Sequence, residues 1–186
     1  MPITTIDPKT ALILIDLQNG IVSLPLAHPV ADVLGNARLL ADAFRARNLP
    51  VVLVNAAGGA PGRVEQPRSI AGRPPEWFEL VPELGRLPTD HTVTKRTWGA
   101  FTRGDLEQKL RALGVTQVVI CGIATSIGVE STARQAYELG FHVTLAVDAM
   151  ADLNAEAHAG SIARIFPRLG ETGTTEEILG LLETGR

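Results

Sequence analysis

Short apolar runs that lack polar alternation restrict the possible folds of this chain more than any other feature. These runs cover residues 11–15, 50–54, 117–121 and 142–147, and residues 91–94 are predicted as a further, short strand. A strand with one face in water alternates apolar and polar residues, whereas a strand covered on both faces does not. These runs therefore predict the buried strands of a largely parallel sheet.

The segments between the runs have helical spacing of their apolar residues. Leu106, Leu110 and Leu113 share one face, with Asp105 as the expected N-cap and Gly114 as the stop signal. The predicted helices cover residues 30–48, 106–113, 126–139, 154–166 and 176–182. Alternating strands and helices predict a three-layer α/β/α architecture. The length of 186 residues predicts a single domain over 1–186.

Composition argues against several classes of partner. The net charge of -3 gives no electrostatic reason to expect binding to nucleic acid or to an anionic membrane. No apolar run approaches the roughly 18 residues that span a bilayer. The N-terminus has no secretory signal pattern, and one cysteine cannot form an internal disulfide framework. We therefore expect a cytoplasmic protein that acts on a small molecule.

Residues 56–90 form one long irregular region rich in proline and glycine. Long loops on a rigid scaffold often shape a binding site, and a solvated excursion is the alternative.

Two charged residues directly follow predicted strands. Asp16 follows five apolar residues, and Lys95 closes the short strand. Ligands of open parallel sheets bind beyond the carboxyl ends of the strands. Burial raises the pKa of a carboxyl unless a cation lies close, and a lysine at a neighbouring strand end would provide that cation. The residues alone leave open whether this is an acid/base pair or a structural ion pair.

The turn at 122–129 leads from a strand into a helix. The first N–H groups of a helix have no partners within the helix, so this turn can offer an anion or oxyanion site.

Four blocks in this order resemble the isochorismatase-like cysteine hydrolases. They are residues 11–19, with an Asp-x-Gln signature, 94–101, with a lysine followed by Ala-Phe, 119–136 and 140–149. The spacing of Asp16, Lys95 and residue 128 is typical of the family. The resemblance implies a hydrolase with Asp16 as acid/base and Lys95 as its partner.

The family has a nucleophilic cysteine where this chain has Gly128. The resemblance also implies a non-proline cis peptide at Ile123–Ala124. The residues that it assigns to substrate or oxyanion binding are Gln18, Ile123, Ala124, Thr125, Ile127 and Phe101.

Glycine cannot act as a nucleophile, but true isochorismatases also tend to have glycine at this position. In those enzymes the aspartate protonates the methylene carbon of a vinyl ether, water adds to the oxocarbenium ion, and pyruvate leaves without a covalent intermediate. Asp16 would then have to be protonated at the outset. Its apolar position would favour protonation and Lys95 would oppose it.

Other interpretations stay open from the sequence. The chain could be a catalytically silent homologue that binds a small molecule, or an amide hydrolase that uses activated water. Cys121 is a weak candidate for a substitute nucleophile, because a thiol in a buried strand is usually inert. The scattered histidines predict no catalytic metal, and we expect no cofactor. The resemblance implies a homo-oligomer, either a dimer or a tetramer.

Overall fold

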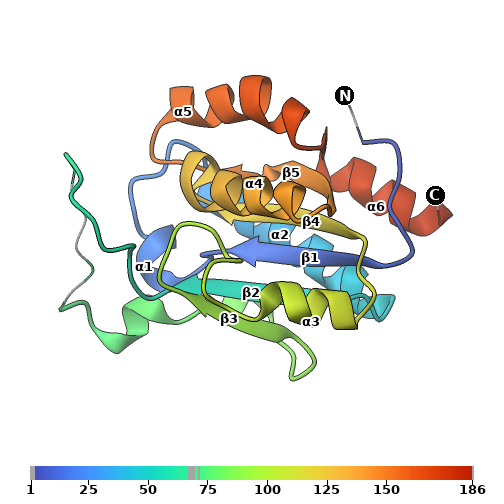
Figure 1. Ribbon diagram of the computed structural model, residues 1–186, viewed down its shortest axis with the longest axis horizontal. Coiled ribbons are helices and arrows are strands. Elements are labelled where there is room, and N and C mark those ends of the chain that lie inside the picture. Colours follow the sequence, from blue (N-terminus) through green and yellow to red (C-terminus); the bar gives the residue numbers. More distant parts are fainter. Residues whose placement is uncertain (1–2, 67–69, 71, 186) are drawn as a thin grey trace.

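The computed structural model describes residues 3–66, 70 and 72–185 and contains a six-stranded sheet (Figure 1). All of its strand pairings are parallel, and the strand order is β3-β2-β1-β4-β5-β6. The strands are β1 (Thr10–Ile15), β2 (Val51–Ala56), β3 (His91–Lys95), β4 (Gln117–Ile123), β5 (His142–Ala151) and β6 (Glu171–Gly173). The predicted buried strands are confirmed, since every residue of β1 and β4 is buried.

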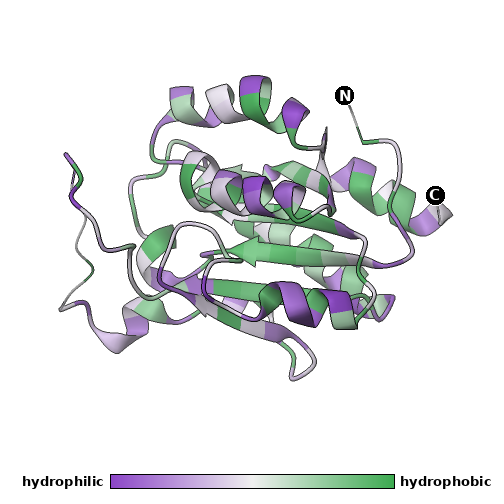
Figure 2. Cartoon of the chain, in the orientation of Figure 1, coloured by the Kyte–Doolittle hydropathy of each residue, from purple (hydrophilic) through white to green (hydrophobic). Residues whose placement is uncertain are grey.

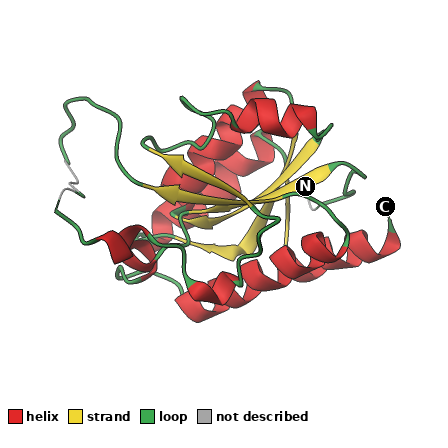
Figure 3. Ribbon diagram, turned by 90° about the horizontal axis from the view of Figure 1, so that it is seen from below, coloured by secondary structure: helices red, strands yellow, loops and turns green. Residues whose placement is uncertain are grey.

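Helices cover both faces of the sheet, as predicted. The helices are α1 (Asn19–Val22), α2 (Val30–Ala46), α3 (Leu106–Ala112), α4 (Glu130–Glu138), α5 (Ala155–Gly160) and α6 (Thr175–Thr184). Figure 1 places α3 and α4 in front of the sheet and α2 and α6 behind it, and Figure 3 shows helices on both sides of the sheet. Apolar residues concentrate in the central strands between these layers (Figure 2). No helix within the described ranges is long and apolar enough to cross a membrane.

Several predicted helix boundaries differ from the structure. The helix predicted at 126–139 begins as a π-helical turn, η3 (Thr125–Val129), before it continues as α4. The helix predicted at 154–166 is divided into α5, a π turn at Ser161–Ile165 and a 3-10 turn at Phe166–Arg168. The sequence analysis did not identify α1 or β6.

Asp105 occupies the N-cap position of α3 as predicted, and Gly114 follows the end of the helix with a φ of +71°. The Asp105 carboxylate makes no capping hydrogen bond and instead pairs with Lys109 at 2.9 Å, because that ammonium lies one helical turn away.

The irregular region after β2 packs partly against the start of α1. It contains two short 3-10 turns, η1 (Pro75–Phe78) and η2 (Pro82–Leu84), and its residues 67–69 and 71 lie outside the described ranges. Trp77 covers Gly20 so closely that a Cβ on Gly20 would lie 2.0 Å from the indole ring. Leu80 forms an isolated antiparallel bridge with Gln18. Part of the region is therefore held beside the carboxyl end of β1.

A close approach between β1 and β4 marks the centre of the sheet. Gly122 has a φ of +119°, and a Cβ there would lie 2.1 Å from the carbonyl oxygen of Ile15. The β4–β5 register shifts between Ile120 and Gly122. Connections leave β1 and β4 toward opposite edges, so their carboxyl ends form the crevice in which open α/β sheets bind ligands.

Candidate functional site

Asp16 and Lys95 form a buried ion pair at this crevice. Lys95 Nζ lies 2.7 Å from Asp16 Oδ2, and the two residues are only 4% and 6% exposed. The expectation that they follow neighbouring strands is wrong, because β2 lies between β1 and β3. Ile15 pairs with Val54, whereas Lys95 pairs with Ala56, which lies farther along β2. The lysine side chain therefore passes over the end of β2 to reach the carboxylate.

Burial has a larger effect on the Asp16 carboxyl than its cationic neighbour does. Burial raises the pKa of Asp16 to about 6, while the charge and hydrogen bond of Lys95 oppose that rise. Oδ2 binds Lys95, whereas Oδ1 is buried with no hydrogen-bond partner among the described residues. One carboxyl oxygen therefore keeps unused hydrogen-bonding capacity, and a pKa of about 6 leaves roughly a tenth of the group protonated at pH 7.

Gly128 lies directly beside this pair. A Cβ built on Gly128 would be 3.2 Å from Asp16 Oδ2, 3.5 Å from Lys95 Nζ and 2.9 Å from Ile15 Cγ2. The residue belongs to η3, and its carbonyl oxygen accepts a hydrogen bond of 2.7 Å from Thr132 Oγ1 on α4. Any side chain at position 128 would therefore contact both charged groups.

The turn between β4 and η3 contains the predicted cis peptide at Ile123–Ala124. Two of its polar groups are used within the protein. The Ile127 N–H donates to the carbonyl oxygen of Ala124 at 3.1 Å, and the Thr125 hydroxyl donates to the carbonyl oxygen of Ala151 at 3.1 Å. The turn lies beside the ion pair, but these two groups serve its internal structure.

The side-chain amide of Gln18 binds the backbone of two other segments. Its Oε1 accepts from Ala56 N at 2.7 Å, and its Nε2 donates to the carbonyl oxygens of Ala56 and Trp77 at 3.1 and 3.3 Å. These bonds connect the end of β1 to the end of β2 and to η1. Substrate contact by Gln18 stays a prediction, and the geometry favours a structural role for its amide.

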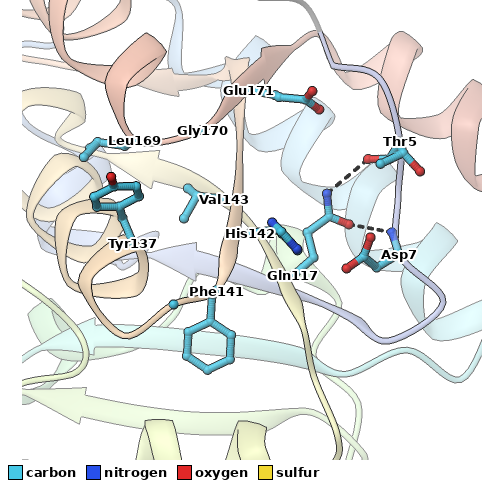
Figure 4. Close-up of a pocket in the computed structure, with 11 residues that line it drawn as sticks. Thr5, Asp7, Gln117, Tyr137, Phe141, His142, Val143, Leu169, Gly170 and Glu171 are labelled. Carbon is cyan, nitrogen blue, oxygen red and sulfur yellow. Dashed lines mark hydrogen bonds between the residues drawn. The ribbon is translucent and has the colours of Figure 1, made fainter.

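The Phe101 ring stacks on Phe141 with centroids 5.9 Å apart. Substrate contact by Phe101 stays a prediction. Phe141 directly precedes β5 and lines a pocket at the amino ends of β4 and β5, where Gln117 binds Thr5 and Asp7 (Figure 4). Asp16 follows the carboxyl end of β1, at the opposite edge of the parallel sheet.

Cys121 is fully buried within β4. Burial raises the pKa of its thiol to about 12, and the charge of Asp148 adds to the rise. A thiol in this state is a poor nucleophile, which favours the inert interpretation.

The sequence analysis missed Asp152 and His158, which bind the turn that carries Gly128. Asp152 follows β5 and accepts from Ser126 N at 2.7 Å, and His158 on α5 lies 2.8 Å from the Thr125 hydroxyl. The position of Asp152 just beyond a buried strand was a usable signal. His158 gave none, since a single histidine on a helix is a common surface residue.

No three metal-binding side chains gather in the part of the chain that the structure describes. The expectations of no catalytic metal and no cofactor stay predictions.

Comparisons with known proteins identify the family. The isochorismatase domain matches residues 10–177. An uncharacterised isochorismatase family protein, YwoC of Bacillus subtilis, is 46% identical over 92% of this chain and 93% of its own length. Streptothricin hydrolase of Streptomyces noursei is 38% identical over 91% of this chain and 59% of its own length. The structure of an isochorismatase family protein from Burkholderia thailandensis superposes with a TM-score of 0.92 at 43% identity, covering 96% of this chain and 98% of that one. The chain belongs to the isochorismatase family of hydrolases.

Proposed function

We propose that this chain hydrolyses a small, carboxylate-bearing vinyl ether without a covalent enzyme intermediate, with Asp16 as the general acid and Lys95 as its partner. Gly128 occupies the position of the family's nucleophilic cysteine. The unpartnered, buried Oδ1 of Asp16 is the observation that supports this function most directly. This oxygen belongs to a carboxyl group whose pKa is raised. Position 128 beside it is a glycine and offers no nucleophilic side chain.

The proposed reaction begins with protonated Asp16. The carboxyl transfers its proton to the terminal methylene carbon of the enol ether, and the ether oxygen stabilises the resulting oxocarbenium ion. Lys95 stabilises the carboxylate that forms, because its ammonium lies 2.7 Å from Oδ2. Water adds to the cationic carbon and returns a proton to Asp16. The hemiketal then collapses to an alcohol and a keto acid, which is pyruvate when the substrate carries an enolpyruvyl group.

Two other functions are the alternatives to this proposal. Hydrolysis of an amide by activated water is the second candidate, and streptothricin, which the name of one relative gives as a substrate, is included in the test below. A silent binding homologue is the third. The buried ion pair argues against it, since burying two charges costs several kcal/mol per ion before their attraction is counted.

The test compares product release from isochorismate, streptothricin and a panel of small amides. We expect pyruvate from isochorismate, and we expect Asp16→Asn to reduce its release at least about a hundredfold, the lower range for loss of general acid catalysis. Asp148→Asn is the matched control, because this β5 carboxylate binds the first turn of α6 and lies outside the ion pair. Circular dichroism checks that each variant folds. Ammonia release without pyruvate would replace the vinyl ether proposal with amide hydrolysis, and no product from any substrate would favour the binding homologue.

A further inference from the structure

Asp152 fixes the first part of the turn that carries Gly128. Its Oδ2 accepts two hydrogen bonds from Ser126, one from the backbone N at 2.7 Å and one from Oγ at 2.8 Å. Its Oδ1 accepts from Asn154 N at 3.2 Å, and its carbonyl oxygen accepts from Ala27 N at 2.8 Å. Asp152 is only 3% exposed, so water competes little with these bonds.

His158 fixes the neighbouring residue of the same turn. The Thr125 hydroxyl has a single proton, which it donates to the carbonyl oxygen of Ala151. At 2.8 Å from His158 Nδ1, the hydroxyl must therefore accept from an Nδ1–H group. The ring of His28 lies 4.2 Å from that of His158. Burial and His28 lower the pKa of His158, while Asp152 opposes that change.

These bonds lie close to Gly128 along the chain. Thr125 and Ser126 are the first two residues of η3, and Gly128 is the fourth. Thr132 holds the carbonyl of Gly128 from the other side. With both sides fixed, the turn places position 128 in contact with Asp16 and Lys95. Releasing one side would change that distance.

We propose that Asp152 and His158 are positioning residues, which set the distance between the η3 turn and the Asp16–Lys95 pair. They act through Ser126 and Thr125 rather than by touching the substrate. The effect on turnover rests on the proposed function, whereas the effect on the position of residue 128 can be measured without a substrate.

The first test measures turnover of isochorismate by variants of His158. The η3 turn lies against Asp16, and a displacement of about 1 Å beside a reacting group can cost on the order of a hundredfold in rate. We expect His158→Leu to lower kcat by about tenfold to a hundredfold while KM changes much less. In His158→Asn the amide nitrogen replaces Nδ1 and can still donate to Thr125, so activity should recover. In His158→Gln the amide nitrogen replaces Nε2 instead, so activity should stay low.

Asp152 has a matched control in the same strand region. Asp148 Oδ1 accepts from Thr175 N at 2.7 Å and from Thr175 Oγ1 at 2.9 Å, the same pattern that Asp152 makes with Ser126. Asp148 holds α6 rather than η3. We expect Asp152→Asn to lower kcat and Asp148→Asn to leave it unchanged, even where both variants lower the melting temperature. Equal kcat losses in both variants would overturn the proposal.

The second test needs no substrate. Gly128→Cys introduces a thiol beside Lys95, and its pKa, followed by thiolate absorbance or alkylation rate, reports the distance to that cation. Cys121 does not interfere, because burial raises its pKa to about 12. We expect His158→Leu or Asp152→Asn, added to Gly128→Cys, to raise the thiol pKa by about one unit, and Asp148→Asn to leave it unchanged.

The two tests separate the two proposals. An unchanged thiol pKa in folded His158→Leu and Asp152→Asn backgrounds would overturn the positioning role, whatever the activity. A raised thiol pKa in a chain whose unsubstituted form hydrolyses nothing would support the positioning role and contradict the proposed function.

Discussion

Asp16 combines two unfavourable properties in one residue. Its backbone has a φ of +53°, in the left-handed region that residues other than glycine seldom adopt. Its carboxyl is buried beside a cation that satisfies only one of its oxygens. Such costs tend to occur where a geometry serves a ligand, and aspartate is among the residues that tolerate the left-handed region best.

We expect the rate of hydrolysis to fall as pH rises, because Asp16 loses its proton. In the proposed reaction the reactive form of Asp16 is protonated, and its pKa is raised from 3.8 to about 6, so the acid form dominates below about pH 6. We expect kcat/KM for isochorismate to be level below about pH 6 and to fall tenfold per pH unit above it. The pH–rate profile measures this directly. A profile that rises through pH 6 would instead indicate that the carboxylate acts as a base.

Position 128 should accept a nucleophile. A Cβ there would lie 2.9 Å from Ile15 Cγ2, 3.2 Å from the Asp16 carboxylate and 3.5 Å from the Lys95 ammonium, so after a small shift of the Ile15 methyl a thiol would have both a base and a cation beside it. We expect Gly128→Cys to gain amidase activity that iodoacetamide abolishes. Gly128→Ala is the matched control, because it adds the Cβ without the thiol. Equal amidase activity in the two variants would contradict this prediction.

At the scale of the element, the contact of β4 with β1 depends on one glycine. Gly122 and Gly114 both have a positive φ, but only Gly122 has another strand within reach of an added Cβ. Gly114→Ala should therefore cost only backbone strain, about 1 kcal/mol. Gly122→Ala adds a backbone clash with Ile15 and should lower the free energy of unfolding by more than about 3 kcal/mol. Urea denaturation of both variants measures the difference, and equal losses would contradict it.

The sequence predicted the elements with strong periodicity and missed the short ones. The buried strands and α2 were recovered because their apolar patterns continue over several residues. β6 has three residues, Glu-Thr-Gly, and α1 has four, so neither is long enough to repeat its period of side-chain positions twice. The π turns were missed because a change of helical period leaves no local signal in the sequence.

The candidate site, like the fold, could be predicted from the sequence only where a local pattern marks a residue. Asp16 was found because it directly follows an apolar strand, and Lys95 because it closes a short strand. The order of the strands is a tertiary property, so β2 was not expected to lie between them. Phe101 was assigned by resemblance, and its packing against Phe141 depends on a contact between distant segments.

At the scale of the whole molecule, the surface retains several large apolar side chains. Trp98, Leu39 and Tyr137 are 63%, 54% and 53% exposed. Single exposed apolar residues are normal on a monomer, so these side chains do not define an interface. The resemblance to the family implies self-association, and the prediction of a dimer or tetramer rests on that.

Sedimentation equilibrium tests this prediction at micromolar concentration. We expect a mass of two or four times the 19.8 kDa of one chain. A concentration-independent mass near 19.8 kDa would contradict it.

The contact between Gly128 and the ion pair has a consequence for how this family diversifies. Glycine and cysteine codons can differ by a single nucleotide. Because residue 128 lies against both the acid and the cation, that one substitution would add a nucleophile to a site whose other groups are already in place. Covalent and non-covalent hydrolysis would then be separated on this scaffold by one point mutation, and lineages could cross between the two chemistries without altering the fold.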